Sequence, residues 1–110
     1  MEIALVPHFC WGQFEVPNAT GPEFNFPPQA QCGPAMNHYC PGLLQLIRAK
    51  RASNKRDRFY NFGQADANIR YTENAMKDYP RCSLREHVAA SRAELNNLMT
   101  VFGYQGRRPK

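Results

Sequence analysis

Prolines recur every few residues through the first forty residues, and their spacing constrains the fold more than any other feature of the sequence. Prolines stand at positions 7, 17, 22, 27, 28 and 34. Each of them fixes its own backbone φ angle, lacks an amide donor and disfavours helical backbone in the residue before it. No helix of useful length fits between them. The sequence therefore predicts an extended, irregular N-terminal arm over residues 1–40.

Large apolar side chains lie between these prolines. Burying one such side chain is worth roughly 1.5–3 kcal/mol, and an isolated extended segment cannot shield it from water. We therefore expect these side chains to dock on a partner chain. The alternative, favoured less, is that they fold back on the protein's own body. The residues assigned to this docking are Phe9, Trp11, Phe14, Phe24 and Phe26.

The rest of the chain predicts a helical body over residues 41–103. A first helix is expected to begin at Pro41, because proline suits the first helical position and an apolar patch follows it. A second helix is expected over residues 64–78, after a break at Gly63. Apolar residues recur there three and four positions apart, as on one face of a helix, and Pro80 ends the pattern.

The third helix has the clearest boundaries. Ser83 and Glu86 match the S-x-x-E capping box, an apolar stripe follows, and Gly103 stands where a C-terminal cap is expected. A basic tail occupies residues 104–110. The predicted fold class is therefore mainly α, with a small bundle of two to three short helices and a long extended N-terminal arm.

Charge divides along the same line as the fold. Residues 1–47 contain three glutamates and no lysine or arginine, whereas residues 48–110 contain all 14 basic residues against six acidic ones, a net charge of +8. Such asymmetry favours contact with an anionic surface, whether nucleic acid, acidic lipid or acidic protein. A solvated surface without a target is the alternative. The predicted contact residues are Arg48, Lys50, Arg51, Lys55, Arg56 and Arg58.

The chain contains four cysteines, Cys10, Cys32, Cys40 and Cys82. An even number permits three disulfide connectivities in an oxidising compartment. Three of the cysteines lie in the arm, where a bridge such as Cys10–Cys32 or Cys32–Cys40 would restrict the chain most. The alternative is four reduced thiols that act as small buried hydrophobes.

The sequence lacks the patterns that catalysis or a cofactor requires. Two His-aromatic-Cys triplets, at 8–10 and 38–40, offer zinc-type ligands, but no C-x-x-C or H-x3-H spacing accompanies them. There is no glycine loop of the phosphate-binding types, and the nine acidic residues are scattered. We therefore expect a non-enzymatic protein with no metal, no cofactor and no catalytic residues.

No apolar run in the sequence approaches the roughly 18 residues of a membrane-spanning helix. The start of the chain also lacks the basic region and long apolar stretch of a secretory signal. We therefore expect a soluble or peripheral protein with no membrane-spanning segment.

Small size, peripheral character, cysteine content and moderate basicity favour a structural accessory subunit of a large assembly. In this interpretation the arm straps several neighbouring protein subunits together. The expected host is a mitochondrial respiratory-chain membrane complex, with the protein peripheral to the inner membrane and in contact with anionic lipid head groups.

Two other interpretations compete with the accessory subunit. In the alternative reading the protein is an RNA-binding structural protein of an organellar ribosome, in which the basic segment and the terminal Arg107, Arg108 and Lys110 contact phosphate. The third interpretation is a small secreted module held by disulfides. Four oxidised cysteines in a well-folded monomer would indicate that class.

Overall fold

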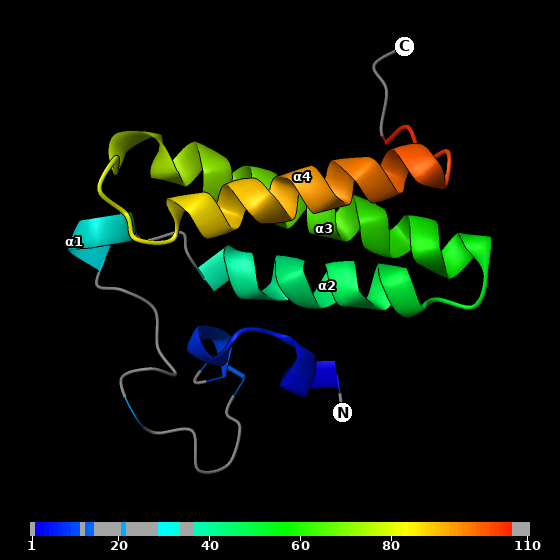
Figure 1. Ribbon diagram of the computed structural model, residues 1–110, viewed down its shortest axis with the longest axis horizontal. Helices are drawn as coiled ribbons and strands as arrows, with labels where there is room; N and C mark the ends of the chain where they lie inside the picture. The colour runs from blue at the N-terminus through cyan, green and yellow to red at the C-terminus, as the bar shows by residue number, and fades with distance from the viewer. Residues whose placement is uncertain (1, 12, 15–20, 22–28, 34–36, 107–110) are drawn as a thin grey trace.

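The computed structural model describes residues 2–11, 13, 14, 21, 29–33 and 37–106, and it shows a bundle of three long helices (Figure 1). They are α2 (Tyr39–Arg51), α3 (Lys55–Ala75) and α4 (Arg85–Val101). Helices α2 and α3 run antiparallel side by side, and α4 packs on α3. No strand occurs among the described residues. The predicted mainly α fold with a small helical bundle is confirmed.

The start of α3 differs from the prediction. The side chain of Asn54 accepts a hydrogen bond of 2.8 Å from the Asp57 amide, and this N-cap starts the helix at Lys55, nine residues before the expected position. The predicted break at Gly63 is wrong, because α3 runs through it. A Cβ atom added at Gly63 would lie 3.0 Å from the Tyr104 hydroxyl. The missing side chain at Gly63 therefore leaves room for Tyr104, and the glycine does not end the helix.

The sequence predicted the C-terminal end of α4 correctly but not its N-terminal cap. The capping box is wrong, because Leu84 occupies the N-cap position and no side chain caps the helix. Ser83 instead donates a 2.8 Å hydrogen bond to Gln31, which is distant in the sequence. At the other end the prediction is confirmed. Gly103 has a φ of 74°, and the Tyr104 amide bonds to the Met99 carbonyl at 2.8 Å, as in a Schellman motif.

The core lies where the apolar faces of the three helices meet. The face predicted for the second helix is buried, and Gly42 of α2 lies against it. A Cβ atom added at Gly42 would come within 3.2 Å of Ile69, so the glycine lets α2 and α3 approach closely. Helix α2 begins at Tyr39, two residues before the expected start. The principal buried side chains of the bundle are Tyr39, Leu43, Leu46, Ala49, Phe62, Ala65, Ile69, Thr72, Val88 and Leu95.

The described part of the N-terminal arm is folded onto the bundle. Two single 3-10 turns, η1 (Glu2–Leu5) and η2 (His8–Cys10), lie beneath α2 in Figure 1, and the one-turn helix α1 (Gln29–Cys32) lies at the end of the bundle. Val6 is buried. The partly buried rings that pack against the core from this segment are Phe9, Trp11 and Phe14.

These three aromatic side chains therefore contact their own body, the alternative that the sequence favoured less, and their docking on a partner stays a prediction. Phe24 and Phe26, also predicted to dock on a partner, lie outside the described residues. So do Arg107, Arg108 and Lys110 of the basic tail.

Two disulfides hold the N-terminal segment on the bundle. Cys10 pairs with Cys40 at the start of α2, and Cys32 pairs with Cys82 in the α3–α4 connection, with Cα atoms 5.6 and 4.6 Å apart. The pairings that the sequence singled out, Cys10–Cys32 and Cys32–Cys40, do not form. Each bridge instead joins the segment before α2 to the helical bundle. Because Cys32 lies between Cys10 and Cys40 in the sequence, the two loops that the bridges close overlap.

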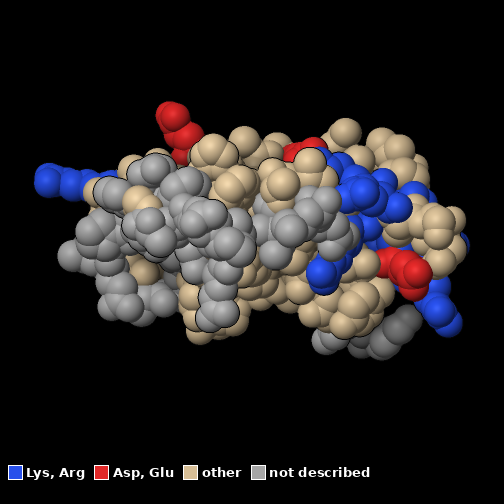
Figure 2. All heavy atoms as spheres, turned by 90° about the horizontal axis from the view of Figure 1, so that it is seen from below, with Lys and Arg blue, Asp and Glu red and all other residues tan. Residues whose placement is uncertain are grey.

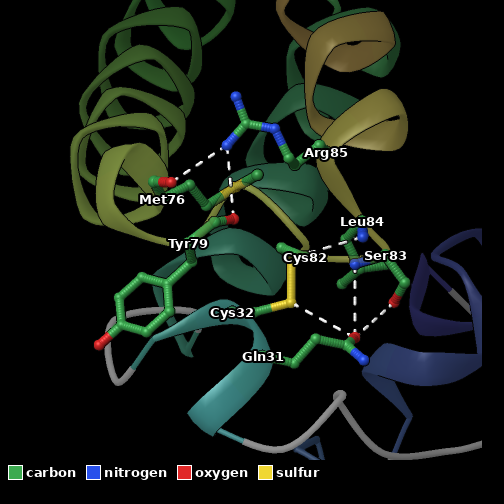
Figure 3. The surroundings of a disulfide bond; sticks show 8 residues. All are labelled: Gln31, Cys32, Met76, Tyr79, Cys82, Ser83, Leu84 and Arg85. Carbon is green, nitrogen blue, oxygen red and sulfur yellow. Dashed lines mark hydrogen bonds between the residues drawn. A yellow bond between two sulfur atoms is a disulfide. The ribbon is translucent and has the colours of Figure 1, made fainter.

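The Cys32–Cys82 disulfide lies in a polar junction between α1, the α3–α4 connection and the start of α4 (Figure 3). Gln31 accepts hydrogen bonds from both the amide and the hydroxyl of Ser83, at 3.3 and 2.8 Å. The junction therefore joins α1 to the connection by side-chain hydrogen bonds as well as by the covalent bridge.

Within the described part of the chain, no helix has the length and apolarity needed to cross a membrane.

Each disulfide should contribute to stability. Replacing either pair with serines, Cys10→Ser with Cys40→Ser or Cys32→Ser with Cys82→Ser, should lower the free energy of unfolding by about 2–4 kcal/mol, because the unfolded chain gains freedom. Urea titrations of both double variants measure the loss. Peptide mapping without reduction checks the pairing, and recovery of a Cys10–Cys32 peptide would contradict it.

Candidate functional site

Five of the six basic residues predicted to meet an anionic surface form an exposed basic end of the bundle. Figure 2 shows lysine and arginine side chains gathered at this end, where α2 stops and α3 begins. All five are exposed. We use the name basic end for Arg48, Lys50, Arg51, Lys55 and Arg56.

The positive charge of the basic end is only partly compensated. Lys50 lies 3.0 Å from Glu94 of α4, and Arg56 lies 3.8 Å from Asp57. Exposed ion pairs of this kind contribute roughly 0–1 kcal/mol each. Arg51 has no hydrogen-bond or ion-pair partner among the described residues. Arg51 and Lys55 have no acidic partner among the described residues, so positive charge at this end remains available to a ligand or partner.

The sixth predicted contact residue, Arg58, has a structural role instead. Its guanidinium donates hydrogen bonds to the Ala49 carbonyl at 3.1 Å and to the Ala52 carbonyl at 2.6 Å, where α2 ends. It also lies 4.2 Å from the centre of the Phe102 ring, beyond the end of α4. A cation on the last carbonyls of a helix satisfies its unpaired acceptors and its dipole. Arg58 therefore joins the ends of three helices.

Arg85 repeats this arrangement at the opposite end of the bundle. Its Nη1 donates to the Met76 carbonyl at 3.1 Å and approaches the Tyr79 carbonyl at 3.5 Å (Figure 3). The acceptors belong to the chain that follows α3. Arg58 therefore binds the last carbonyls of α2, and Arg85 binds the last carbonyls of the α3–η5 segment.

The two roles of the basic residues predict different effects of substitution. Arg58→Ala should lower the free energy of unfolding by about 1–3 kcal/mol, because it leaves two carbonyls and a ring without their cation. The neighbouring Arg56→Ala should change it by no more than about 0.5 kcal/mol. Urea denaturation of both variants measures the difference. Equal effects of the two substitutions would contradict the structural role.

A buried polar cluster connects α2 to α4. The hydroxyl of Tyr39 contacts Nδ1 of His87, the carbonyl of His87 at 3.1 Å and the hydroxyl of Ser91 at 2.8 Å. A tyrosine hydroxyl has one proton to donate and can accept two hydrogen bonds. All three contacts are satisfied if Tyr39 donates to the carbonyl and accepts from Ser91 and from His87 Nδ1–H.

Burial shifts the acidity of this cluster. Desolvation raises the pKa of Tyr39, partly opposed by its hydrogen bond to Ser91, so the phenol is neutral at physiological pH. Desolvation also lowers the pKa of His87 from its usual value of 6.5. Phe9 lies edge-on to the His87 imidazole, with ring centres 5.2 Å apart. The neutral phenol of Tyr39 and the neutral imidazole of His87, with the Phe9 ring packed against the imidazole, therefore form a structural link between α2 and α4.

The lowered pKa of His87 predicts how stability depends on pH. The unfolded chain binds a proton near pH 6.5 while the folded protein resists it, so the contribution is complete above pH 6.5 and is lost as pH falls through the folded pKa. The free energy of unfolding should therefore decrease in this window, by at most about 1.4 kcal/mol per pH unit. Denaturant titrations between pH 5 and 8 measure this slope.

His87→Asn provides the control for this prediction. Asparagine offers a side-chain amide donor close to the position of Nδ1 but does not titrate. The variant should keep the link to Tyr39 and lose part of the slope. An unchanged slope in His87→Asn would assign the pH dependence to other groups.

A second polar cluster joins α4 to α3. The Arg92 guanidinium donates to Asp66 at 2.7 Å and to Glu73 at 3.0 Å, and Asp66 also pairs with Arg70 at 2.8 Å. Burial alone would lower the pKa of Arg92, but hydrogen bonds and charge interactions with Glu73 and Asp66 raise it. The guanidinium is therefore fully charged, and it is neutralised by two carboxylates.

Sequence reasoning missed both polar clusters. Ser91 lies in sequence between Val88 and Leu95, which are both buried on α4, and a hydroxyl at helical spacing between apolar residues is the one sequence signal for a buried partner. No sequence pattern links Tyr39 to α4, because the two residues that it meets there lie 48 and 52 positions away. Among the described residues, no group of three or more His, Cys, Asp or Glu side chains is placed to hold a metal ion.

Compared with known protein families, curated proteins and solved structures, the chain matches none of them.

Proposed function

We propose that the protein is a non-catalytic structural accessory subunit of a large assembly, and that it attaches through its basic end to an acidic protein surface. The observation that carries the proposal is the exposed positive charge at the α2–α3 connection. Arg58 holds this connection in place through its hydrogen bonds to the Ala49 and Ala52 carbonyls. Charge of one sign on a fixed surface selects and orients a partner of the other sign.

Exposed apolar side chains at the same end of the bundle support attachment to protein. Tyr60 of α3 is 66% exposed and Val101 of α4 is 67% exposed. Tyrosine and arginine are enriched in protein interfaces, where the ring supplies contact area and the charge supplies specificity. Nucleic acid would use the charge, but would leave Val101 in water.

The two disulfides favour the accessory subunit over the RNA-binding alternative. Disulfides persist in oxidising compartments and are rare where glutathione keeps thiols reduced. A ribosomal environment is reducing, whereas an assembly in an oxidising compartment matches both bridges. The respiratory-chain host and the location peripheral to the mitochondrial inner membrane stay predictions from the sequence.

The secreted module draws support from the same observation, since all four cysteines are paired. The two classes differ in their partners. A secreted module is expected to be a monomer in its native surroundings, whereas an accessory subunit is expected to migrate with other chains. Native mass therefore separates them.

Charge reversal at the basic end tests the proposal. In extracts of the source cells the wild-type protein should migrate at a high native mass, and Arg51→Glu with Arg56→Glu should release it to the monomer mass. The reason is that two repulsive charges replace two attractive ones at the contact. Native electrophoresis with detection of the protein measures the shift.

Lys77→Glu with Arg81→Glu provides the matched control, because both residues are exposed and lie at the opposite end of the bundle. This variant should keep the high mass. A monomer mass for the wild-type protein, or equal release of both variants, would overturn the proposal. Loss of the high mass after ribonuclease treatment would assign the basic end to RNA, and loss after detergent would assign it to lipid.

A further inference from the structure

A polar cavity opens between α3, α4 and the chain that follows α4. Its volume is about 540 Å³, and small-molecule sites commonly measure about 300–1,000 Å³. It lies away from the α2–α3 connection, because its lining from α3 begins at Gly63. None of the residues of the basic end lines the cavity.

The charged groups in the wall of this cavity are all ion-paired, one of them with a residue outside the wall. Asp66 accepts from Arg92 at 2.7 Å and from Arg70 at 2.8 Å, and Arg92 also pairs with Glu73. Asp66, Arg70 and Arg92 line the cavity, whereas Glu73 lies outside its lining; counted with Glu73, the four groups carry no net charge. A charged ligand would have to compete with these pairs, so the cavity favours an uncharged ligand.

Uncommitted amide side chains surround the neutral ion-pair network. Gln64, Asn74 and Gln105 line the cavity and make no side-chain hydrogen bonds among the described residues. Asn96 uses its carbonyl oxygen to accept from Arg92 at 3.2 Å, which leaves its NH₂ group available. Each amide can donate and accept, and a ligand hydroxyl can do the same. The wall therefore suits a ligand that carries several hydroxyl groups.

Two tyrosines complete the wall. Tyr71 is 52% exposed although His38 stacks on it, with ring centres 4.0 Å apart. This support fixes the orientation of the exposed ring. Tyr104 lines the cavity from the segment after α4. The face of an aromatic ring is electron-rich, and it attracts the weakly positive C–H groups on the flat face of a sugar ring.

We propose that this cavity binds a saccharide, with Tyr71 as the stacking surface and the amides of Asn74, Asn96 and Gln105 as hydrogen-bonding partners for its hydroxyl groups. The assignment joins three independent observations: ion pairing of every charged group in the wall, unused amides and a supported aromatic ring. It goes beyond the proposed attachment to an assembly, because none of these residues belongs to the basic end.

Nuclear magnetic resonance titration of the full chain with both disulfides intact tests the proposal. Glucose, galactose, mannose, N-acetylglucosamine and their β-linked disaccharides serve as probes at up to 50 mM (about the scale at which weak sites saturate). At least one probe should cause saturable shifts in the side-chain amide signals of Asn74, Asn96 and Gln105. Raising the salt concentration should leave the affinity unchanged, because the ligand carries no charge.

Two substitutions define the site, and a third is the matched control. Tyr71→Ala and Asn74→Ala, both at exposed positions of α3, should weaken binding at least about tenfold. Tyr60→Ala removes a tyrosine of similar exposure from the same helix outside the cavity, and it should leave binding unchanged.

Several outcomes would overturn the assignment. They are the absence of saturable shifts with every saccharide, equal effects of Tyr71→Ala and Tyr60→Ala, or stronger shifts with uridine or adenosine than with any sugar. The folded state of each variant is checked in the same spectra, so loss of binding is distinguished from unfolding. Failure here would leave the native-mass experiment on the basic end unaffected.

Discussion

The disulfides Cys10–Cys40 and Cys32–Cys82 fix a segment that has little regular structure of its own. Single 3-10 turns such as η1 and η2 satisfy few backbone groups and do not persist alone. Once Cys10 is tied to α2, the neighbouring Val6 and Phe9 reach the core at small further loss of entropy. The covalent bridges therefore make possible the burial of aromatic groups that prolines would otherwise keep apart.

Arginine performs three different tasks in this bundle, and the surroundings of each residue decide which. Arg58 and Arg85 close the ends of helical segments by binding their last carbonyls. Arg92 is enclosed by Asp66 and Glu73 and joins two helices. Arg51 has none of these partners among the described residues and keeps its charge for an external one. A count of basic residues therefore overstates the surface that is available for binding.

Hydrophobic spacing predicted that three helices form and which face of the second is buried, because burial of one face follows directly from residues three and four apart, but it did not predict where the second helix begins. Ala65, Ile69 and Thr72 are all fully buried, as their spacing indicated. Features that depend on distant partners were not predictable. The sequence predicted that Ser83 caps a helix, but its hydroxyl donates to Gln31. The sequence also placed Arg58 on the contact surface, but its guanidinium binds the end of α2. Disulfide pairing is of the same kind, since sequence alone leaves three connectivities open.

The order of the bridges along the chain also bears on how the protein acquires them. During synthesis Cys10, Cys32 and Cys40 emerge before Cys82, and neighbouring thiols meet first because short loops close most readily. Neither native bridge joins consecutive cysteines. An early bond between neighbours must therefore be broken by thiolate attack and exchanged before the final set forms. Catalysis of disulfide isomerisation would speed this exchange.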